Sequence, residues 1–191
     1  MPDAGYVIRL AAPADASAIS DVITASARGL SVGHYEPEVV EAALRGAFGV
    51  DSQLVDDGTY FVATVGEAIV GCGGWSRRRT LFGGDAFTVR DATPLDPATE
   101  AARIRAFFVL PSHARQGIGK AILQRCESDA ASMGYSQFAL MATLPGVKFY
   151  SALGYVAEEP LQYDLGHGRS IRFVPMQKVT KAVEKRHAPA I

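Results

Sequence analysis

One strand–turn–helix unit constrains the fold of this chain more than any other stretch. Residues 107–123 read FFVLPSHARQGIGKAIL, in which an apolar run leads through a polar turn into apolar residues at helical spacing. Gly117 and Gly119 stand where the helix begins, although glycine is among the poorest helix formers. The pattern predicts a strand that enters a helix over 116–133, and Gly134 marks the end of that helix.

The two glycines indicate an anion site at the start of this helix. The first turn of a helix has backbone N–H groups without partners, and the positive end of the helix dipole lies behind them. Gly117 and Gly119 remove the side chains that would hold a phosphate away from the backbone, and two of them clear room for a diphosphate. The other interpretation is that both glycines only allow the helix to pack closely on a strand.

Two common phosphate-binding patterns do not fit this segment. A P-loop would need glycine at Ala114 and serine or threonine at Ala121. The dinucleotide-binding fingerprint would need a third glycine, where the chain has Ile122. The predicted anion site therefore belongs to neither class.

Strands and helices alternate along the rest of the chain. Strands are expected over residues 6–10, 59–65, 68–75, 101–111, 137–143, 155–165 and 170–178, and helices over 13–30, 37–48, 116–133 and 145–153. Residues 76–100 are polar and predict a long connection, for which a small ribbon, an active-site flap and an interface stay open. We expect one α+β domain over 1–178 and a charged, flexible tail over 179–191.

The composition argues against several classes of protein. The chain has 191 residues, of which 48% are apolar, and a formal net charge of −1, so a nucleic acid or a membrane surface is not an expected partner. We see no signal peptide and no run near the ~20 apolar residues of a membrane span, and expect a cytoplasmic protein. Cys72 and Cys126 lie in apolar runs and are expected to be buried free thiols. The four histidines show no metal-ligand spacing, so no metal is expected.

Two segments resemble the signatures of GNAT-type acetyltransferases. VLPSHARQGIGKAILQRCE, residues 109–127, is similar to the family's acetyl-CoA-binding segment, in which a Val-x-Pro step precedes Q/R-x-x-G-x-G/A and a helix. KFYSALGY, residues 148–155, is similar to its second signature, F-Y-x-x-x-G-F/Y. The resemblance implies a GNAT-like fold: a mixed, mostly antiparallel central sheet, splayed between its fourth and fifth strands, with helices on both faces. Two positions depart from the family pattern: Ala114 stands where Q/R is usual, and Thr143 where many members have asparagine.

The resemblance also implies acetyl-CoA as cofactor and assigns roles to residues. The pantetheine arm would pair with the main chain of the fourth strand, and the N–H groups of residues 116–120 would hold the pyrophosphate. The implied cofactor-binding residues are Phe107, Val109, Arg115, Gln116, Gly117, Ile118, Gly119, Lys120, Thr143, Phe149 and Tyr150. In the catalytic roles, the N–H of Val109 would donate to the acetyl carbonyl, and Tyr150 would act as general acid toward the sulfur. The alternative for Tyr150 is packing of its short helix.

No general base stands out in the sequence. Some family members carry a glutamate on the fourth strand near the position of Arg103, and arginine cannot act as a base. We therefore expect the amine to lose its proton through ordered water, with Glu100 as a weaker candidate.

Four residues are candidate acceptor contacts. If the fourth strand alternates strictly, Arg103 and Arg105 share a face with Phe107 and Val109. Guanidinium groups suit carboxylates and phosphates, so the acceptor would be anionic; the alternative is that both arginines pair with acidic residues of the preceding loop. Trp75 and Tyr35 lie where the family builds its acceptor pocket, and core packing is the alternative for both.

The function implied is transfer of an acetyl group from acetyl-CoA to the amine of a small, anionic metabolite, by direct attack through a tetrahedral intermediate. Two alternatives stay open, a non-catalytic module that senses acetyl-CoA and a protein N-acetyltransferase. A homodimer is a further expectation by analogy with the family.

Overall fold

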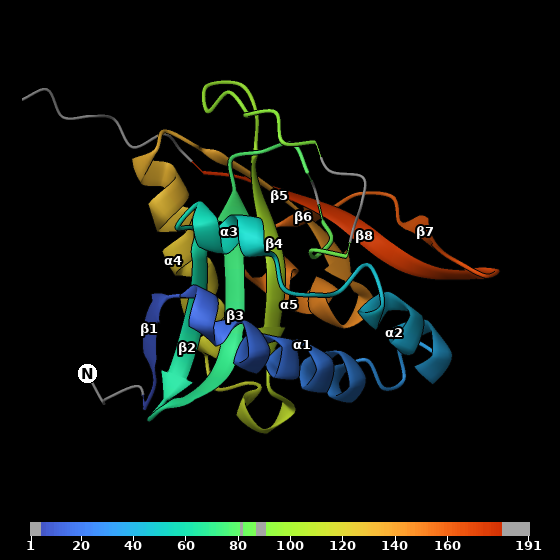
Figure 1. The fold of residues 1–191 in the computed structure, drawn as a ribbon. Coiled ribbons are helices and arrows are strands. Elements are labelled where there is room, and N and C mark those ends of the chain that lie inside the picture. Colours follow the sequence, from blue (N-terminus) through green and yellow to red (C-terminus); the bar gives the residue numbers. More distant parts are fainter. Residues whose placement is uncertain (1–4, 81, 87–90, 181–191) are drawn as a thin grey trace, which may run out of the picture.

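A single mixed sheet runs through the centre of the molecule (Figure 1). The computed structural model describes residues 5–80, 82–86 and 91–180. Within these residues the strand order is β1 (Val7–Leu10), β2 (Tyr60–Val65), β3 (Ala68–Ser76), β4 (Ala102–Val109), β5 (Gln137–Thr143), β8 (Arg169–Val179) and β6 (Val156–Ala157), and β7 (Leu161–Gly166) pairs with β8. Neighbouring strands are antiparallel except β4 and β5, which are parallel. The expected mixed, mostly antiparallel sheet is confirmed.

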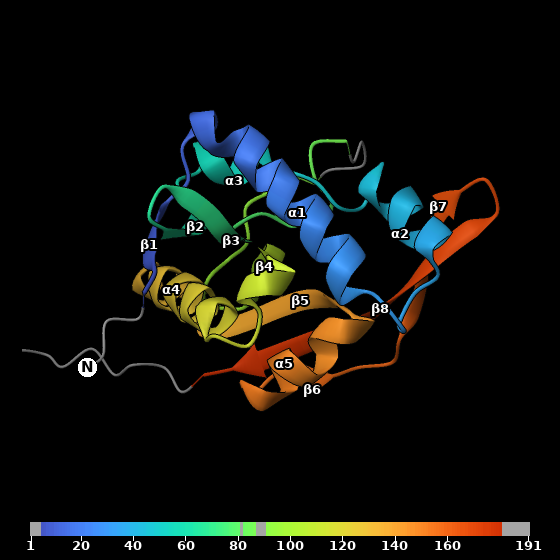
Figure 2. The same cartoon turned by 90° about the horizontal axis from the view of Figure 1, so that it is seen from below.

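Helices cover both faces of this sheet (Figure 2). One face carries α1 (Ala16–Leu30), α2 (Pro37–Leu44) and α3 (Ser52–Asp56), and the other carries α4 (Ile118–Ser132) and α5 (Val147–Ala152). Short 3-10 turns precede α1, α4 and α5, at Pro13–Asp15, Pro111–His113 and Leu144–Gly146. Each layer buries its own apolar cluster against the sheet, which is why the apolar stripes of α1 and α4 have helical spacing.

The sheet splays between β4 and β5. The two strands pair only at their beginnings, Ala102 with Phe138 and Arg103 with Ala139. Beyond Arg103 the edge of β4 that faces β5 has no strand beside it in residues 5–80, 82–86 and 91–180, although β4 continues to Val109. The expected splay is therefore present at the expected place.

A bulge at Ala106 divides β4 into two parts. Arg105 lies opposite Gly74 and Phe108 lies opposite Cys72, so β4 has one residue more than β3 between these pairs. Ala106 has a φ of 54°, in the left-handed region. The ring of Phe107 occupies the place of a Gly73 side chain, since a Cβ on Gly73 would lie 2.6 Å from that ring.

The bulge overturns the predicted strict alternation of β4. Arg103 and Arg105 project to the face covered by α1, whereas Phe107 and Val109 pack with the cluster under α4. The prediction that all four side chains share one face is wrong. The extra residue at position 106 reverses the direction of every side chain after it.

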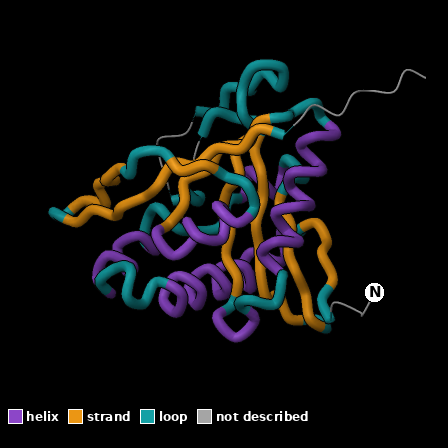
Figure 3. The backbone as a smooth tube through the Cα atoms, turned by 180° about the vertical axis from the view of Figure 1, so that it is seen from behind, coloured by secondary structure: helices purple, strands orange, loops and turns teal. Residues whose placement is uncertain are grey.

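Other elements differ from the sequence predictions in detail. The short helix α3 was not predicted, and the strand expected over 155–165 is divided into β6 and β7. The connection 76–100 pairs near its two ends: the N–H of Arg79 bonds the carbonyl of Thr93, and the N–H of Thr80 bonds that of Asp91. The β7–β8 hairpin reaches outward from the helices (Figure 3). β8 ends one residue beyond the expected limit at 178, and most of the predicted tail, residues 181–191, lies outside the described residues.

Candidate active site

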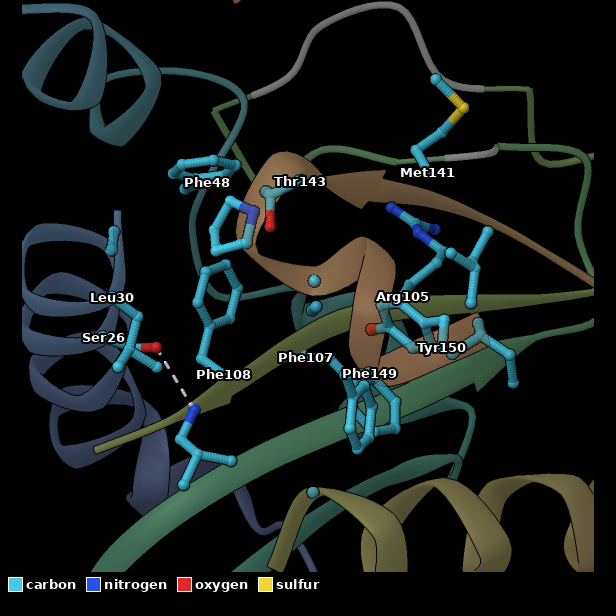
Figure 4. A pocket seen from close by; sticks show the side chains of 18 of the residues that line it. Ser26, Leu30, Phe48, Arg105, Phe107, Phe108, Met141, Thr143, Phe149 and Tyr150 are labelled. Atoms are coloured by element: carbon cyan, nitrogen blue, oxygen red, sulfur yellow. Dashed lines mark hydrogen bonds between the residues drawn. The ribbon is translucent and has the colours of Figure 1, made fainter. Parts of the chain in front are cut away.

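A cavity of about 760 Å³ occupies the splay between β4 and β5 (Figure 4). It is lined from the α4 side by Phe107, Val109 and the beginning of α4, and from the α1 side by Arg105 and Phe108. Side chains from both faces of the sheet therefore meet in one space.

The start of α4 presents its backbone to this cavity. Gly117 is the N-cap residue with a φ of 83°, and Arg115 has a φ of 65°. Among the described residues, the N–H groups of residues 115–120 have no hydrogen-bond acceptor, and the first bond of the helix runs from Ala121 to Gly117. A run of N–H groups with residues in the left-handed region forms an anion-binding concavity.

Gly117 and Gly119 serve different purposes. Gly117 adopts a backbone conformation that side chains disfavour, and a Cβ there would meet only the Tyr6 hydroxyl, at 3.8 Å. A Cβ on Gly119 would lie 3.3 Å from the ring of Phe149, so this glycine allows close packing of α4 on α5. Close packing, one of the two interpretations drawn from the sequence, is thus found at Gly119, but against the helix α5 and not against a strand; the anion site stays a prediction.

Positive charge gathers at this end of the cavity. The lining includes Arg115, Lys120 and Lys148, together with His113. No aspartate or glutamate is among the described residues that line the cavity. The combination favours an anionic ligand at the start of α4.

Tyr150 lies on α5 with its ring against Phe107, Phe149 and Tyr155. Its side chain is 9% exposed, and its hydroxyl has no hydrogen-bond partner within the described part of the chain. Burial raises the pKa of Tyr150 well above its ordinary value, with a further contribution from Cys126. The hydroxyl therefore keeps its proton at neutral pH and is a free donor.

The backbone N–H of Val109 donates to the hydroxyl oxygen of Ser26 on α1, at 3.3 Å (Figure 4). Ser26 is buried and lines the cavity, and sequence reasoning did not single it out. The signal was available: Ser26 is a hydroxyl residue within the apolar stripe of α1, three residues after Ile23.

Comparison with known proteins identifies the architecture. The family model for the acetyltransferase (GNAT) domain matches residues 34–180. The chain belongs to the GNAT acetyltransferase family. It is accordingly an N-acetyltransferase, an acyltransferase, as the two sequence signatures implied. No curated protein matches the chain.

Solved GNAT structures share the fold at low sequence identity. A GCN5-related N-acetyltransferase from Rhodopseudomonas palustris is 19% identical, with a TM-score of 0.66 over 91% of this chain and 94% of that one. PaiA N-acetyltransferase from Thermoplasma acidophilum, solved with coenzyme A, is 15% identical with a TM-score of 0.62 over 91% and 98%. YncA from Salmonella typhimurium, solved with acetyl-CoA, is 15% identical with a TM-score of 0.60 over 97% and 98%.

The predicted cofactor residues of this GNAT domain lie together, with one exception. The cavity lining includes Phe107, Val109, Arg115, Gly117, Ile118, Gly119, Lys120, Thr143, Phe149 and Tyr150. Gln116 is not part of the lining; its side-chain amide donates to the carbonyl of Ser112, at 3.1 Å. Its backbone N–H still belongs to the run at the start of α4.

The four predicted acceptor contacts are dispersed. Only Arg105 lines the cavity. Trp75 is fully buried and its indole N–H donates to Asp129, at 2.8 Å. The hydroxyl of Tyr35 donates to the carbonyl of Arg172 and accepts from the N–H of Leu144, which ties the α1–α2 turn to β8. Burial lowers the pKa of Arg103, which does not line the cavity.

Arg105 is held by an acidic partner that sequence reasoning did not name. One of its terminal nitrogens lies 2.6 Å from a carboxylate oxygen of Asp51 and 2.7 Å from the carbonyl of Gly83. Arg105 is therefore paired with an acidic residue, but with one from the segment before α3 and not from the preceding loop that the alternative named. Glu100, the candidate base, forms an ion pair with Arg79 instead of lining the cavity.

The part of the chain that the structure describes shows no metal site, no membrane-spanning helix and no cysteine nucleophile. No group of histidine, cysteine, aspartate and glutamate there could hold a metal ion. No helix there combines the length and apolar character needed to cross a bilayer. Cys72 and Cys126 are buried and free, as predicted, and burial raises the pKa of Cys72 to about 12, so neither is a nucleophile for this GNAT domain.

Proposed function

We propose that this chain binds acetyl-CoA along β4 and at the start of α4, and transfers the acetyl group to the amine of a small molecule. The observation that carries the proposal is the run of N–H groups at residues 115–120, which lack acceptors within the described part of the chain and lie beside the cavity in the splay. PaiA and YncA, which share the fold, were solved with coenzyme A and acetyl-CoA respectively.

The residues present fit this cofactor. The N–H groups of residues 116–120 would take the pyrophosphate, with Arg115 and Lys120 adding positive charge. The open edge of β4 past Arg103 leaves the main chain of Phe107 and Val109 available to the pantetheine arm. Phe149 and Thr143 line the adjoining wall. When bound, the cofactor supplies an acetyl thioester that is reactive toward an amine.

Two groups of the chain would act on the reacting atoms. The N–H of Val109 lies in the cavity and can donate to an oxygen on which negative charge develops. The hydroxyl of Tyr150 can donate to the sulfur as it leaves. Because a thiol has an ordinary pKa of ~8.5 against ~10 for tyrosine, and burial raises the pKa of Tyr150 further, a hydrogen bond is favoured over full proton transfer.

No carboxylate lines the cavity among the described residues, and the one imidazole in that lining is His113, in the turn before α4. The amine would bind in its neutral form, or lose its proton to His113 or to water. Residues 82–84 line the α1 side of the cavity and limit its size, which suits a small acceptor. Gly84 packs so tightly on Gly49 that a Cβ would lie 2.7 Å from that residue.

Thermal unfolding with and without ligand tests the proposal. Acetyl-CoA at about a hundred times its Kd adds ~2.7 kcal/mol to the free energy of unfolding, which raises Tm by roughly 5–10 °C. S-acetylpantetheine, which lacks the pyrophosphate, should give a much smaller shift. Equal shifts would contradict the role of residues 115–120, and no shift with either compound would contradict cofactor binding. Release of free thiol from acetyl-CoA with a panel of amines then measures turnover.

A further inference from the structure

We infer that the acceptor of this reaction is an amine with an uncharged, apolar alkyl or aryl body, and that this body occupies the α1 side of the cavity. The inference rests on the proposed function and names the substrate class of the same site.

The α1 side of the cavity is an apolar chamber. It is formed by six apolar side chains from six separate segments: Leu30, Phe48, Phe82, Phe108, Met141 and Phe173. The aromatic rings brace one another: Phe48 meets Phe108 edge to face at 5.6 Å between centroids, and Phe82 meets Phe173 at 5.5 Å. Such contacts make fixed walls that suit an apolar group of defined shape.

Among the residues that the structure describes, the chamber holds no charge that an acceptor could use. Arg105 is the one charged side chain on this side of the described lining, and its partner Asp51 neutralises it. Their side chains are 1% and 0% exposed, and Arg105 also donates to the carbonyl of Gly83. A carboxylate on the acceptor would have to compete with Asp51, at the cost of leaving Asp51 buried without its ion pair. The structure thus favours an apolar body over the anionic one expected from the sequence.

A second ammonium group on the acceptor would also be disfavoured in the chamber. The described lining holds no aspartate or glutamate that could pair with it. Burying an unpaired charge in an apolar chamber is strongly unfavourable. The same environment lowers the pKa of the reacting amine, because burial disfavours its charged form. Exclusion of water by the chamber would therefore favour the neutral nucleophile without help from a carboxylate base.

A series of amines tests the inference at about pH 9, where more of each amine is neutral. From ethylamine to hexylamine, kcat/KM should rise about 4-fold for each added methylene while the chamber fills. Phenylethylamine should exceed both phenylalanine, the same body with a carboxylate, and diaminobutane by at least about 10-fold. A flat alkylamine series, or a preference for phenylalanine or diaminobutane, would overturn the inference.

A charged residue in the chamber supplies the second test. Met141→Glu should lower kcat/KM for hexylamine at least about 10-fold and improve diaminobutane relative to it. Met133→Glu, at an exposed methionine after α4, is the matched control and should change neither. Met141→Gln replaces the glutamate variant if the latter does not fold. Unchanged kinetics in a folded Met141 variant would show that the acceptor binds elsewhere.

The Tm shift with acetyl-CoA separates this inference from the proposed function. A variant of Met141 that keeps the shift has an intact cofactor site, so its kinetics report on the acceptor alone. If the unmodified protein shows no shift with acetyl-CoA, the proposed function fails. If the shift is present and the amine preference is reversed, only the inference about the acceptor fails.

Discussion

The backbone N–H of Val109 in β4 and the hydroxyl of Ser26 in α1 form a hydrogen bond of 3.3 Å across the cavity wall. Ser26 thereby gives the N–H of Val109 the acceptor that β5 would provide if the sheet did not splay. The hydroxyl accepts in this bond, so its own hydrogen remains available for donation. If a ligand oxygen took the place of the Ser26 oxygen as acceptor for the Val109 N–H, the hydroxyl of Ser26 could donate to the same oxygen.

Replacement of Ser26 by alanine should therefore slow the reaction. We expect Ser26→Ala to lower kcat at least about 10-fold, because a donor to developing negative charge is lost. Steady-state thiol release measures kcat, and the Tm shift with acetyl-CoA should stay within about 2 °C of the unmodified protein. Ser20→Ala, an exposed serine on the same helix, is the control. If the two variants have the same kcat, Ser26 only stabilises the packing of α1.

Two neighbouring tyrosines should respond differently to loss of the hydroxyl. Tyr150→Phe removes a donor that has no partner in the described residues, so kcat should fall roughly 100-fold with little change in Tm. Tyr155→Phe removes a hydroxyl that donates to Glu127 at 2.9 Å, outside the cavity lining, so Tm should fall and kcat should not. Steady-state assays measure kcat, and calorimetry measures Tm. Equal losses of kcat would count against a role for Tyr150 at the reacting atoms.

The glycine at position 119 should control cofactor affinity. A methyl group added in Gly119→Ala would press on the Phe149 ring, 3.3 Å away, at the place proposed for the pyrophosphate. We expect the Kd for coenzyme A to rise at least about 10-fold, as for loss of one or two charge-assisted hydrogen bonds. Calorimetric titration measures the Kd. Gly46→Ala, where a Cβ has open space and φ is not positive, should leave it unchanged; the same Kd in both variants would move the pyrophosphate elsewhere.

The ion pair between Asp57 and Arg78 should make stability depend on pH. Arg78 donates two hydrogen bonds to the Asp57 carboxylate, at 2.8 and 2.9 Å, and these bonds lower the pKa of Asp57 in the folded state. Because the pKa of Asp57 is lower in the folded state than its value of ~3.9 in the unfolded chain, the ionised carboxylate stabilises the fold at pH values above that unfolded pKa. This stability is lost as the pH falls through the folded-state pKa of Asp57.

Asp57→Asn should therefore lower Tm at pH 7 by roughly 2–4 °C, for a loss of about 1 kcal/mol. The difference from the unmodified protein should shrink as pH falls below about 4. Thermal unfolding as a function of pH measures it. Asp56→Asn changes the preceding, exposed aspartate, which has no ion pair in the described residues, and should show no such trend. A difference that grows on acidification would contradict the role of Asp57.

Most of the order of strands and helices, without α3 and the division between β6 and β7, and the glycine-marked start of α4 could be predicted from sequence. Helical and strand spacing are local properties, and the positive φ of Gly117 depends on a residue type that can be read directly. The two GNAT signatures have the same local character: each is a short stretch whose residues act together without any distant partner.

Tertiary structure decided which face of the sheet each β4 side chain takes and which side chains surround the acceptor. The bulge at Ala106 depends on Gly73 in the neighbouring strand, whose missing side chain admits the Phe107 ring. The partner of Arg105 is Asp51, which is brought to it by the segment before α3. Packing between segments far apart in the chain selects such contacts, and no local pattern encodes them. The sequence by itself therefore determined that this chain is an acetyltransferase, whereas only the folded structure decided what surrounds its acceptor.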